Sequence, residues 1–168
     1  LTAGEPIPDA PLVDQDGEPL PFSGLRGHRV AVTFIYTRCP LPEFCPMMDR
    51  HFAAIQKTIA STPALSDVRL LTITFDPEFD TPAILQAHAR RRGADPAIWT
   101  FATGDPKEVA RFSSQFGIYI ERNPQSAAER FNLLTSANRL RRRATRATTA
   151  VHHDSCKIER SKHNSFSH

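Results

Sequence analysis

The sequence predicts an α/β sandwich in which a mainly parallel sheet is covered by helices. Two apolar, β-branched runs, residues 30–36 and 68–75, have the length and composition of buried strands. A stretch with apolar residues at helical spacing lies between them. Because strand, helix and strand in succession favour a parallel pair with a right-handed crossover, an α/β fold is expected. The length of 168 residues suits one domain with an adequate core.

The N-terminal part is expected to form a β-hairpin over residues 10–22. Asp16-Gly17 supplies its turn. Pro19 and Pro21 have no main-chain N–H group, so the second strand of this hairpin is restricted to a sheet edge. The link that follows is polar, and we expect His28 within it to be solvated rather than a ligand.

The first buried strand leads into a proline-rich loop that holds two cysteines, Cys39 and Cys45. Pro40 and Pro42 push the residues before them out of the helical region. A helix therefore begins only near Cys45, with Pro46 in its first turn, where a missing N–H group costs nothing. The loop can then fold Cys39 back over the start of the helix.

Two sulfur atoms at the start of a helix indicate thiol chemistry. The free N–H groups and the positive end of the helix dipole favour a thiolate there. Two adjacent thiolates can form a disulfide or bind a soft metal ion such as Cu(I). The alternative is a buried cysteine and a purely structural disulfide. The third cysteine, Cys156, has no obvious partner.

The helix after the loop is expected to pack on the sheet through apolar side chains at helical spacing: Met47, Phe52, Ile55 and Ile59. Met47 or Met48 could supply a further soft ligand, although core packing is the favoured role. His51 is expected to be exposed.

Asp76 directly follows the second buried strand. In a parallel pair its strand ends at the same edge as Cys39, where open α/β sheets carry their sites. A carboxylate there could orient a ligand or a partner, or it could simply bond its own turn. Asp80 or Thr81 is expected to cap the next helix, with Pro82 in its first position.

The remaining elements complete the pattern. A helix over residues 82–92 ends in three arginines, which complement its dipole. A short strand follows over residues 99–102, and a further helix begins at Asp105-Pro106 and is stopped by Gly117. This order is that of a thioredoxin-like α/β sandwich with an additional strand and helix.

The composition changes near residue 124. All 14 prolines and all 7 glycines precede residue 125. Residues 125–168 hold nine Lys and Arg but three Asp and Glu, so this tail is strongly basic and the preceding part is slightly acidic. We therefore divide the chain into a domain over 1–124 and an atypical, poorly packed tail over 125–168 that lacks the hairpin expected of a thioredoxin fold. No run approaches the roughly 18 apolar residues of a membrane span.

Three blocks in order resemble the Sco/SenC family: FIYTRCPLPEFCP, RLLTITFDPEFDTP and GADPAIWTFATGDPKEVARF. The resemblance covers residues 10–123. It implies a thioredoxin-fold copper-binding metallochaperone of cytochrome c oxidase assembly. The thiols of Cys39 and Cys45 would bind the copper ion and interconvert with a disulfide. Asp76 would support these two ligands without binding the metal itself. Most members separate the cysteines by three residues, whereas five intervene here.

The third copper ligand of the family is a histidine in a segment resembling T-H-N-L-x-T. The nearest match here, residues 130–135, places Phe131 at the histidine position. A phenylalanine cannot bind a metal ion, and His152 or His153 could replace the histidine only by an unfamiliar path of the chain. Two thiolates still suit Cu(I), whereas Cu(II) binding should suffer.

The resemblance also implies partners and a location. The partners are a copper-receiving oxidase subunit and a thiol reductant, and the setting is periplasmic or bound to the bacterial inner membrane through an N-terminal anchor absent from this sequence. The alternative is an enzyme, a thiol–disulfide oxidoreductase with Cys39 as nucleophile. A peroxidase is disfavoured because only Arg38 separates Thr37 from Cys39. Nucleic acid binding by the basic tail is disfavoured because no aromatic residues are interleaved with its arginines.

Overall fold

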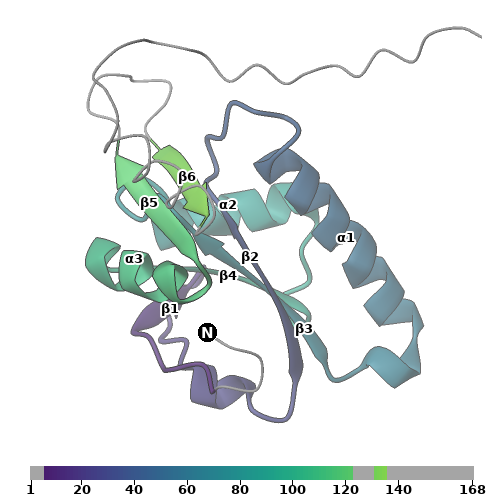
Figure 1. Ribbon diagram of the computed structural model, residues 1–168. Coiled ribbons are helices and arrows are strands. Elements are labelled where there is room, and N and C mark those ends of the chain that lie inside the picture. The colour runs from purple at the N-terminus through teal and green to yellow at the C-terminus, as the bar shows by residue number, and fades with distance from the viewer. Residues whose placement is uncertain (1–5, 123–130, 136–168) are drawn as a thin grey trace, which may run out of the picture.

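The computed structural model describes residues 6–122 and 131–135 of the chain (Figure 1). The described residues form six strands, three α-helices and two 3₁₀ helices. The strands are β1 (Leu12–Asp14), β2 (Arg29–Ile35), β3 (Val68–Thr74), β4 (Trp99–Gly104), β5 (Ile118–Arg122) and β6 (Phe131–Thr135). The helices are α1 (Cys45–Ser61), α2 (Pro82–Arg92) and α3 (Pro106–Gln115), with 3₁₀ turns η1 (Phe22–Leu25) and η2 (Pro63–Leu65).

The central sheet has the strand order β1-β4-β3-β2. β2, β3 and β4 are parallel, and β1 is antiparallel to β4. β5 and β6 form a separate antiparallel pair. The predicted parallel pair of buried strands is therefore confirmed, and helices lie on both sides of the sheet (Figure 1).

Two apolar cores lie between the sheet and its helices, one on each face of the sheet. One core joins α1 and α2 to the sheet through Phe52, Ile59 and Leu85, which pack with Trp99 and Phe101. The other joins α3 to the opposite face: Val109 and Phe112 pack with Leu71, Ile73 and Ala102. Successive residues of β3, Leu70 and Leu71, belong to different cores because side chains alternate across a strand. This double burial explains the near-continuous apolar runs of the sequence.

The predicted N-terminal hairpin is only partly formed. Gly17 occupies the expected turn with φ of 86°. However, β1 makes its ladder with β4, and a single bridge between Val13 and Pro19 represents the second strand. Pro19 and Pro21 have no N–H group to continue that ladder, so the chain turns into η1 instead.

The helix predictions agree closely with the structure. α1 begins at Cys45 with Pro46 in its first turn, and the Asp105 side chain caps α3 by accepting from Lys107 N at 2.8 Å. One detail was wrong: Ile55 is 41% exposed and does not face the sheet. Of the two residues expected to cap α2, Asp80 or Thr81, it is Thr81 that occupies the N-cap position, without a side-chain cap bond.

The end of the described chain contains a pair that the sequence did not predict. β5 and β6 pair from Ile118–Thr135 to Arg122–Phe131. Most of the basic tail lies outside the described residues, including Cys156, His152 and His153. The expectation that this tail is poorly packed therefore stays a prediction. Within the described ranges, no helix has the length and hydropathy to cross a membrane.

Candidate functional site

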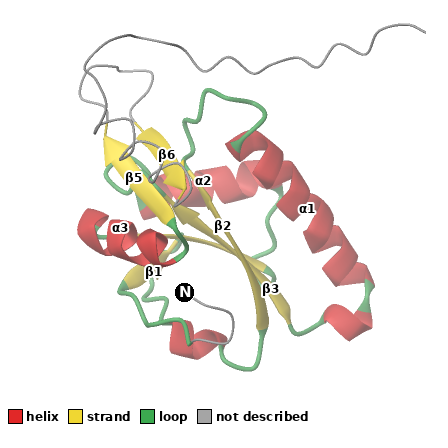
Figure 2. Ribbon diagram, in the orientation of Figure 1, coloured by secondary structure: helices red, strands yellow, loops and turns green. Residues whose placement is uncertain are grey.

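The two cysteines lie where β2 turns toward α1. The β2–β3 register pairs Ile35 with Thr74, so both strands end at one edge of the sheet. Phe75 N donates to Ile35 O at 2.7 Å and extends this alignment by one residue. Figure 2 shows the long loop that leaves this edge and leads to the first turn of α1. Cys39 lies in this loop, and Cys45 is the first residue of the helix.

Main-chain hydrogen bonds fold the loop back on itself. Cys39 N donates to Tyr36 O at 3.2 Å, and Phe44 N donates to Leu41 O at 3.1 Å. Both cysteines are free thiols, and Cys39 lies close enough to Cys45 to contribute to the raised pKa of the Cys45 thiol. Cys39 also lies 3.7 Å from Leu41 O through its sulfur atom. The loop thus brings together two sulfur atoms that come from different elements.

The thiol of Cys45 is protonated rather than activated. Its side chain is 8% exposed, and burial raises its pKa to about 12. The hydrogen bond to Cys39 and the charges of Cys39 and Asp49 act in the same direction, while the main-chain N–H of Tyr36 opposes them. The expectation that the helix start favours a thiolate is therefore wrong for Cys45, because desolvation outweighs the dipole.

Tyr36 is a member of the site that the sequence interpretation missed. It follows β2 directly and packs with Cys39 and Met48 against the core below α1. The pKa of the Tyr36 hydroxyl is raised, first by burial and then by the neighbouring Cys39 thiol, so the hydroxyl stays protonated. Its position in an apolar strand made it look like an ordinary core residue.

Asp76 lies at the end of β3, as expected, and is 3% exposed. Its carboxylate accepts from Arg38, with Nε at 2.7 Å, and Arg38 immediately precedes Cys39. The Arg38 guanidinium also lies 4.1 Å from the centre of the Phe79 ring. Asp76 therefore acts on the cysteine loop through Arg38, and its charge contributes to the raised pKa of Tyr36.

Asp80 is a second buried carboxylate that ties the same two loops together. It is fully buried and accepts from Thr37 N at 3.0 Å, Thr37 Oγ1 at 2.5 Å and Thr74 Oγ1 at 2.5 Å. Thr37 belongs to the cysteine loop, whereas Thr74 ends β3. The position of Asp80 just before a helix suggested a cap, whereas one of the threonines that it binds, Thr37, lies 43 residues away in the sequence.

Beneath the site, Asp49 links α1 to α2. One of its oxygens, Oδ2, lies 2.9 Å from His88 Nε2 and 2.9 Å from Arg92 Nε. Asp49 and His88 are both buried. Among the described residues, the other oxygen of Asp49 has no hydrogen-bond partner. Asp49 is one turn along α1 from Cys45, so this buried network fixes the helix that carries the second thiol.

The other candidate ligands do not join the thiols. His28 and His51 are exposed, as expected, and Met48 packs against the core. Phe131 is the first residue of β6, paired with Arg122. Within the part of the chain that the structure describes, no three His, Cys, Asp or Glu side chains gather as a metal-binding group. That part offers two thiol ligands, Cys39 and Cys45.

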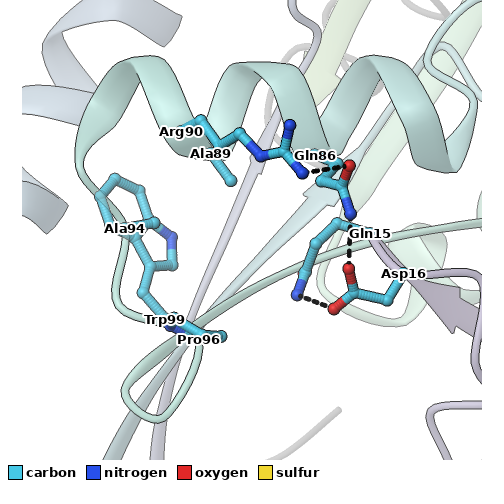
Figure 3. Close-up of a pocket in the computed structure, with 8 residues that line it drawn as sticks. All are labelled: Gln15, Asp16, Gln86, Ala89, Arg90, Ala94, Pro96 and Trp99. Carbon is cyan, nitrogen blue, oxygen red and sulfur yellow. Dashed lines mark hydrogen bonds between the residues drawn. The ribbon is translucent and has the colours of Figure 1, made fainter.

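A separate hollow of about 240 Å³ lies near the start of β4 (Figure 3). Its polar side chains already bond one another: Arg90 donates to Gln86 at 2.8 Å, and Gln86 donates to Asp16 at 2.7 Å. Neither cysteine lines it. We therefore place the functional site at the cysteine loop.

Comparisons with known proteins agree on one family. A family model described as SCO1/SenC matches residues 8–152. The SCO1 protein homolog of Bacillus subtilis (strain 168) is 29% identical over 113 residues, which cover 67% of this chain and 56% of that protein. The chain spans about half the length of the curated relatives that it matches.

Solved structures show the same fold. Bradyrhizobium japonicum ScoI with copper bound matches with a TM-score of 0.62 and 25% identity, covering 75% of each chain. BsSco, a Sco family member in which a disulfide switch was identified, matches with a TM-score of 0.57 and 29% identity, covering 64% of this chain and 60% of that chain. The predicted thioredoxin-like sandwich is confirmed by these likenesses.

Proposed function

The chain belongs to the SCO1/SenC family, and on that premise we propose that it is a copper-binding metallochaperone of cytochrome c oxidase assembly. Cys39 and Cys45 hold the copper ion as cargo, and an oxidase subunit receives it. The setting is a periplasmic or membrane-anchored one, where a cysteine pair can cycle between dithiol and disulfide.

The observation that carries this proposal is the pair of free thiols at the corner between β2 and α1, where Cys39 packs against the core cluster that contains Cys45. Thiolates are soft ligands that select Cu(I) over the harder divalent ions. Cys39 is half-buried and reachable, whereas Cys45 is buried beneath it. An incoming ion or a receiving protein would therefore meet Cys39 first.

The dithiol must be regenerated if the pair is oxidised. Disulfide formation removes two electrons and two protons from Cys39 and Cys45, so the protein needs a thiol reductant to bind copper again. Within this proposal, Asp76 holds Arg38 and thereby supports the loop that carries Cys39.

Anaerobic Cu(I) titration against a competing chelator tests the proposal. The protein carries Cys156→Ser, so that only the pair contributes thiols. We expect tight binding of one ion per chain, lost in both Cys39→Ser and Cys45→Ser. A protein that leaves all copper with the chelator, or a single-cysteine variant that binds as tightly as the parent, would overturn the proposal.

A thiol–disulfide oxidoreductase is the second candidate, favoured by the same reachable dithiol. The raised pKa of Cys45 does not separate the two candidates, because the expected nucleophile is Cys39 and copper binding also requires thiolates. An insulin reduction assay separates the two functions. Rapid reduction of insulin by a protein that binds no copper would favour the thiol–disulfide oxidoreductase.

A further inference from the structure

Asp80 links the start of the cysteine loop to the turn that follows β3. Its carboxylate accepts from the main-chain N–H of Thr37 at 3.0 Å and from the Thr37 hydroxyl at 2.5 Å. The oxygen that accepts from Thr37 N also accepts from the Thr74 hydroxyl at 2.5 Å. Because Thr37 lies two residues before Cys39, Asp80 acts on the loop close to its first thiol.

The Asp80 carboxylate is itself held in place by the fold. Asp80 is fully buried, and its main-chain N–H donates to Asp76 O at 2.7 Å. Thr81 N donates to Phe79 O at 2.8 Å, so the turn after β3 is tight. The chain continues into α2, where the buried Leu85 donates its N–H to Thr81 O at 2.9 Å. Since β3 and α2 fix this turn from both sides, the carboxylate is positioned before any ion or oxidant arrives.

The position of Cys39 depends on the residues that precede it. Its N–H donates to Tyr36 O at 3.2 Å, and Thr37 is bonded to Asp80. The residues after Cys39 face solvent, with Leu41 at 49% and Phe44 at 61% exposure. Side chains this exposed contribute little packing. The anchored residues before Cys39 therefore place its sulfur atom.

The chemistry of a cysteine pair depends on how closely the fold holds one thiol to the other. Forming a disulfide within one chain, or binding one ion through two thiols, is favoured when the second group is already held near the first. Cys45 is fixed as the first residue of α1, whereas Cys39 is fixed through the loop. A looser loop would spread Cys39 over a larger volume and lower its effective concentration at Cys45.

We propose that Asp80 is a positioning residue that acts through Thr37: it holds Cys39 beside Cys45 and raises the effective concentration of each thiol for the other. This role needs no metal ion. Its extension to copper affinity rests on the proposed function, in which the same two thiols bind the ion.

Thr37→Val, in a Cys156→Ser background, tests the first part because it removes the hydroxyl bond to Asp80 and keeps the main-chain bond. The protein dithiol is equilibrated with oxidised glutathione. It gives up two electrons and two protons, which yields a protein disulfide and two reduced glutathione molecules. The equilibrium constant, measured by thiol trapping and mass spectrometry, is the effective concentration. It should fall about fivefold, the size of one hydrogen bond.

Two further variants separate positioning from stability. Thr37→Ser keeps a hydroxyl donor and should stay within about twofold of the parent. Thr72→Val removes another buried hydroxyl, the acceptor of Trp99 Nε1 at 2.8 Å, and should lower the melting temperature without changing the effective concentration. Equal effective concentrations in Thr37→Val and the parent would overturn the proposal. So would an equal fall in Thr72→Val, because the effect would then follow stability.

A chelator competition on the same variants tests the second part. Thr37→Val should hold Cu(I) several-fold more weakly than Thr72→Val, because residues that orient metal ligands contribute to affinity. If the parent binds no Cu(I) while Thr37→Val still lowers the effective concentration, the proposed function fails and the positioning role stands. If the parent binds Cu(I) and Thr37→Val changes neither readout, the positioning role fails alone.

Discussion

At the scale of single residues, the site depends on buried carboxylates that bond across loops. Asp76 fixes Arg38, and Asp80 fixes Thr37, so two successive residues before Cys39 are anchored to the segment after β3. The sequence could place Asp76 at the correct edge because parallel strands share it. It could not assign Asp80, because a carboxylate that precedes a helix is usually a cap and nothing local identifies threonines as its partners.

Asp80→Asn tests the anchoring of the loop. The side chain keeps its shape, but the amide lacks the charge that three donors now share, so the free energy of unfolding should fall by about 2 kcal/mol. Urea denaturation measures this change. Asp95→Asn is the control, because Asp95 is exposed and its carboxylate accepts one hydrogen bond, from Ala97 N. A comparable loss in both variants would contradict the prediction.

The raised pKa of Cys45 makes its reactivity pH-dependent. Only the thiolate is alkylated, so native Cys45 should react with iodoacetamide roughly a thousandfold more slowly at pH 8 than in urea-unfolded protein. Its rate should keep rising above pH 9, the ordinary thiol value, toward its folded pKa near 12. Fragment-ion mass spectrometry distinguishes Cys45 from Cys39 within one peptide.

The same shift affects stability. A folded pKa above the unfolded value stabilises the protein fully below pH 9, and this contribution is lost as the pH rises toward 12. Alkylation of native Cys45 as fast as in the unfolded chain would contradict the buried, protonated thiol.

At the scale of elements, α1 is attached to α2 by a charged network as well as by apolar packing. Asp49, His88 and Arg92 form this network. Helical spacing predicted Phe52 and Ile59 at the core but treated polar positions as solvated. A buried aspartate on one helix is recognisable only when its partner on another helix is known, which one-dimensional periodicity cannot provide.

Asp49→Ala removes the buried acceptor that His88 and Arg92 share and leaves the buried His88 ring without this partner. The free energy of unfolding should therefore fall by about 2 kcal/mol, measured by urea denaturation. Glu108→Ala breaks the exposed pair with Arg111 on α3 and should cost less than about 0.5 kcal/mol. Similar losses in the two variants would show that the α1–α2 network contributes no more than a surface pair.

At the scale of the whole molecule, the order of strands and helices followed from the sequence, whereas long-range pairings did not. Prolines at positions 46, 82 and 106 marked helix starts, and two apolar runs marked the central strands. The partner of β1 is β4, far along the chain, and local turn signals suggested a hairpin instead. β5 and β6 were missed because the connection between them, residues 123–130, contains no short Asn-Gly or Asp-Gly turn of the kind that marks a hairpin.

A deletion of residues 136–168 tests whether the tail contributes to copper binding. It removes His152 and His153 but retains β6. If the two thiols are the Cu(I) ligands, the affinity should change by less than about twofold in the chelator competition. A tenfold loss would assign a ligand to the tail. Deletion of residues 154–168, which keeps both histidines, is the control.

The two sulfur atoms are carried by parts of the chain that are fastened independently. Thr37 and Arg38 hold the strand side, and the first turn of α1 holds the other side, while Leu41 at 49% and Phe44 at 61% exposure face solvent between them. Insertions and deletions are tolerated best where side chains bear no packing. The loop between the two cysteines can therefore be lengthened or shortened near Leu41 and Phe44, while the contacts of Thr37, Arg38 and α1 on either side are retained.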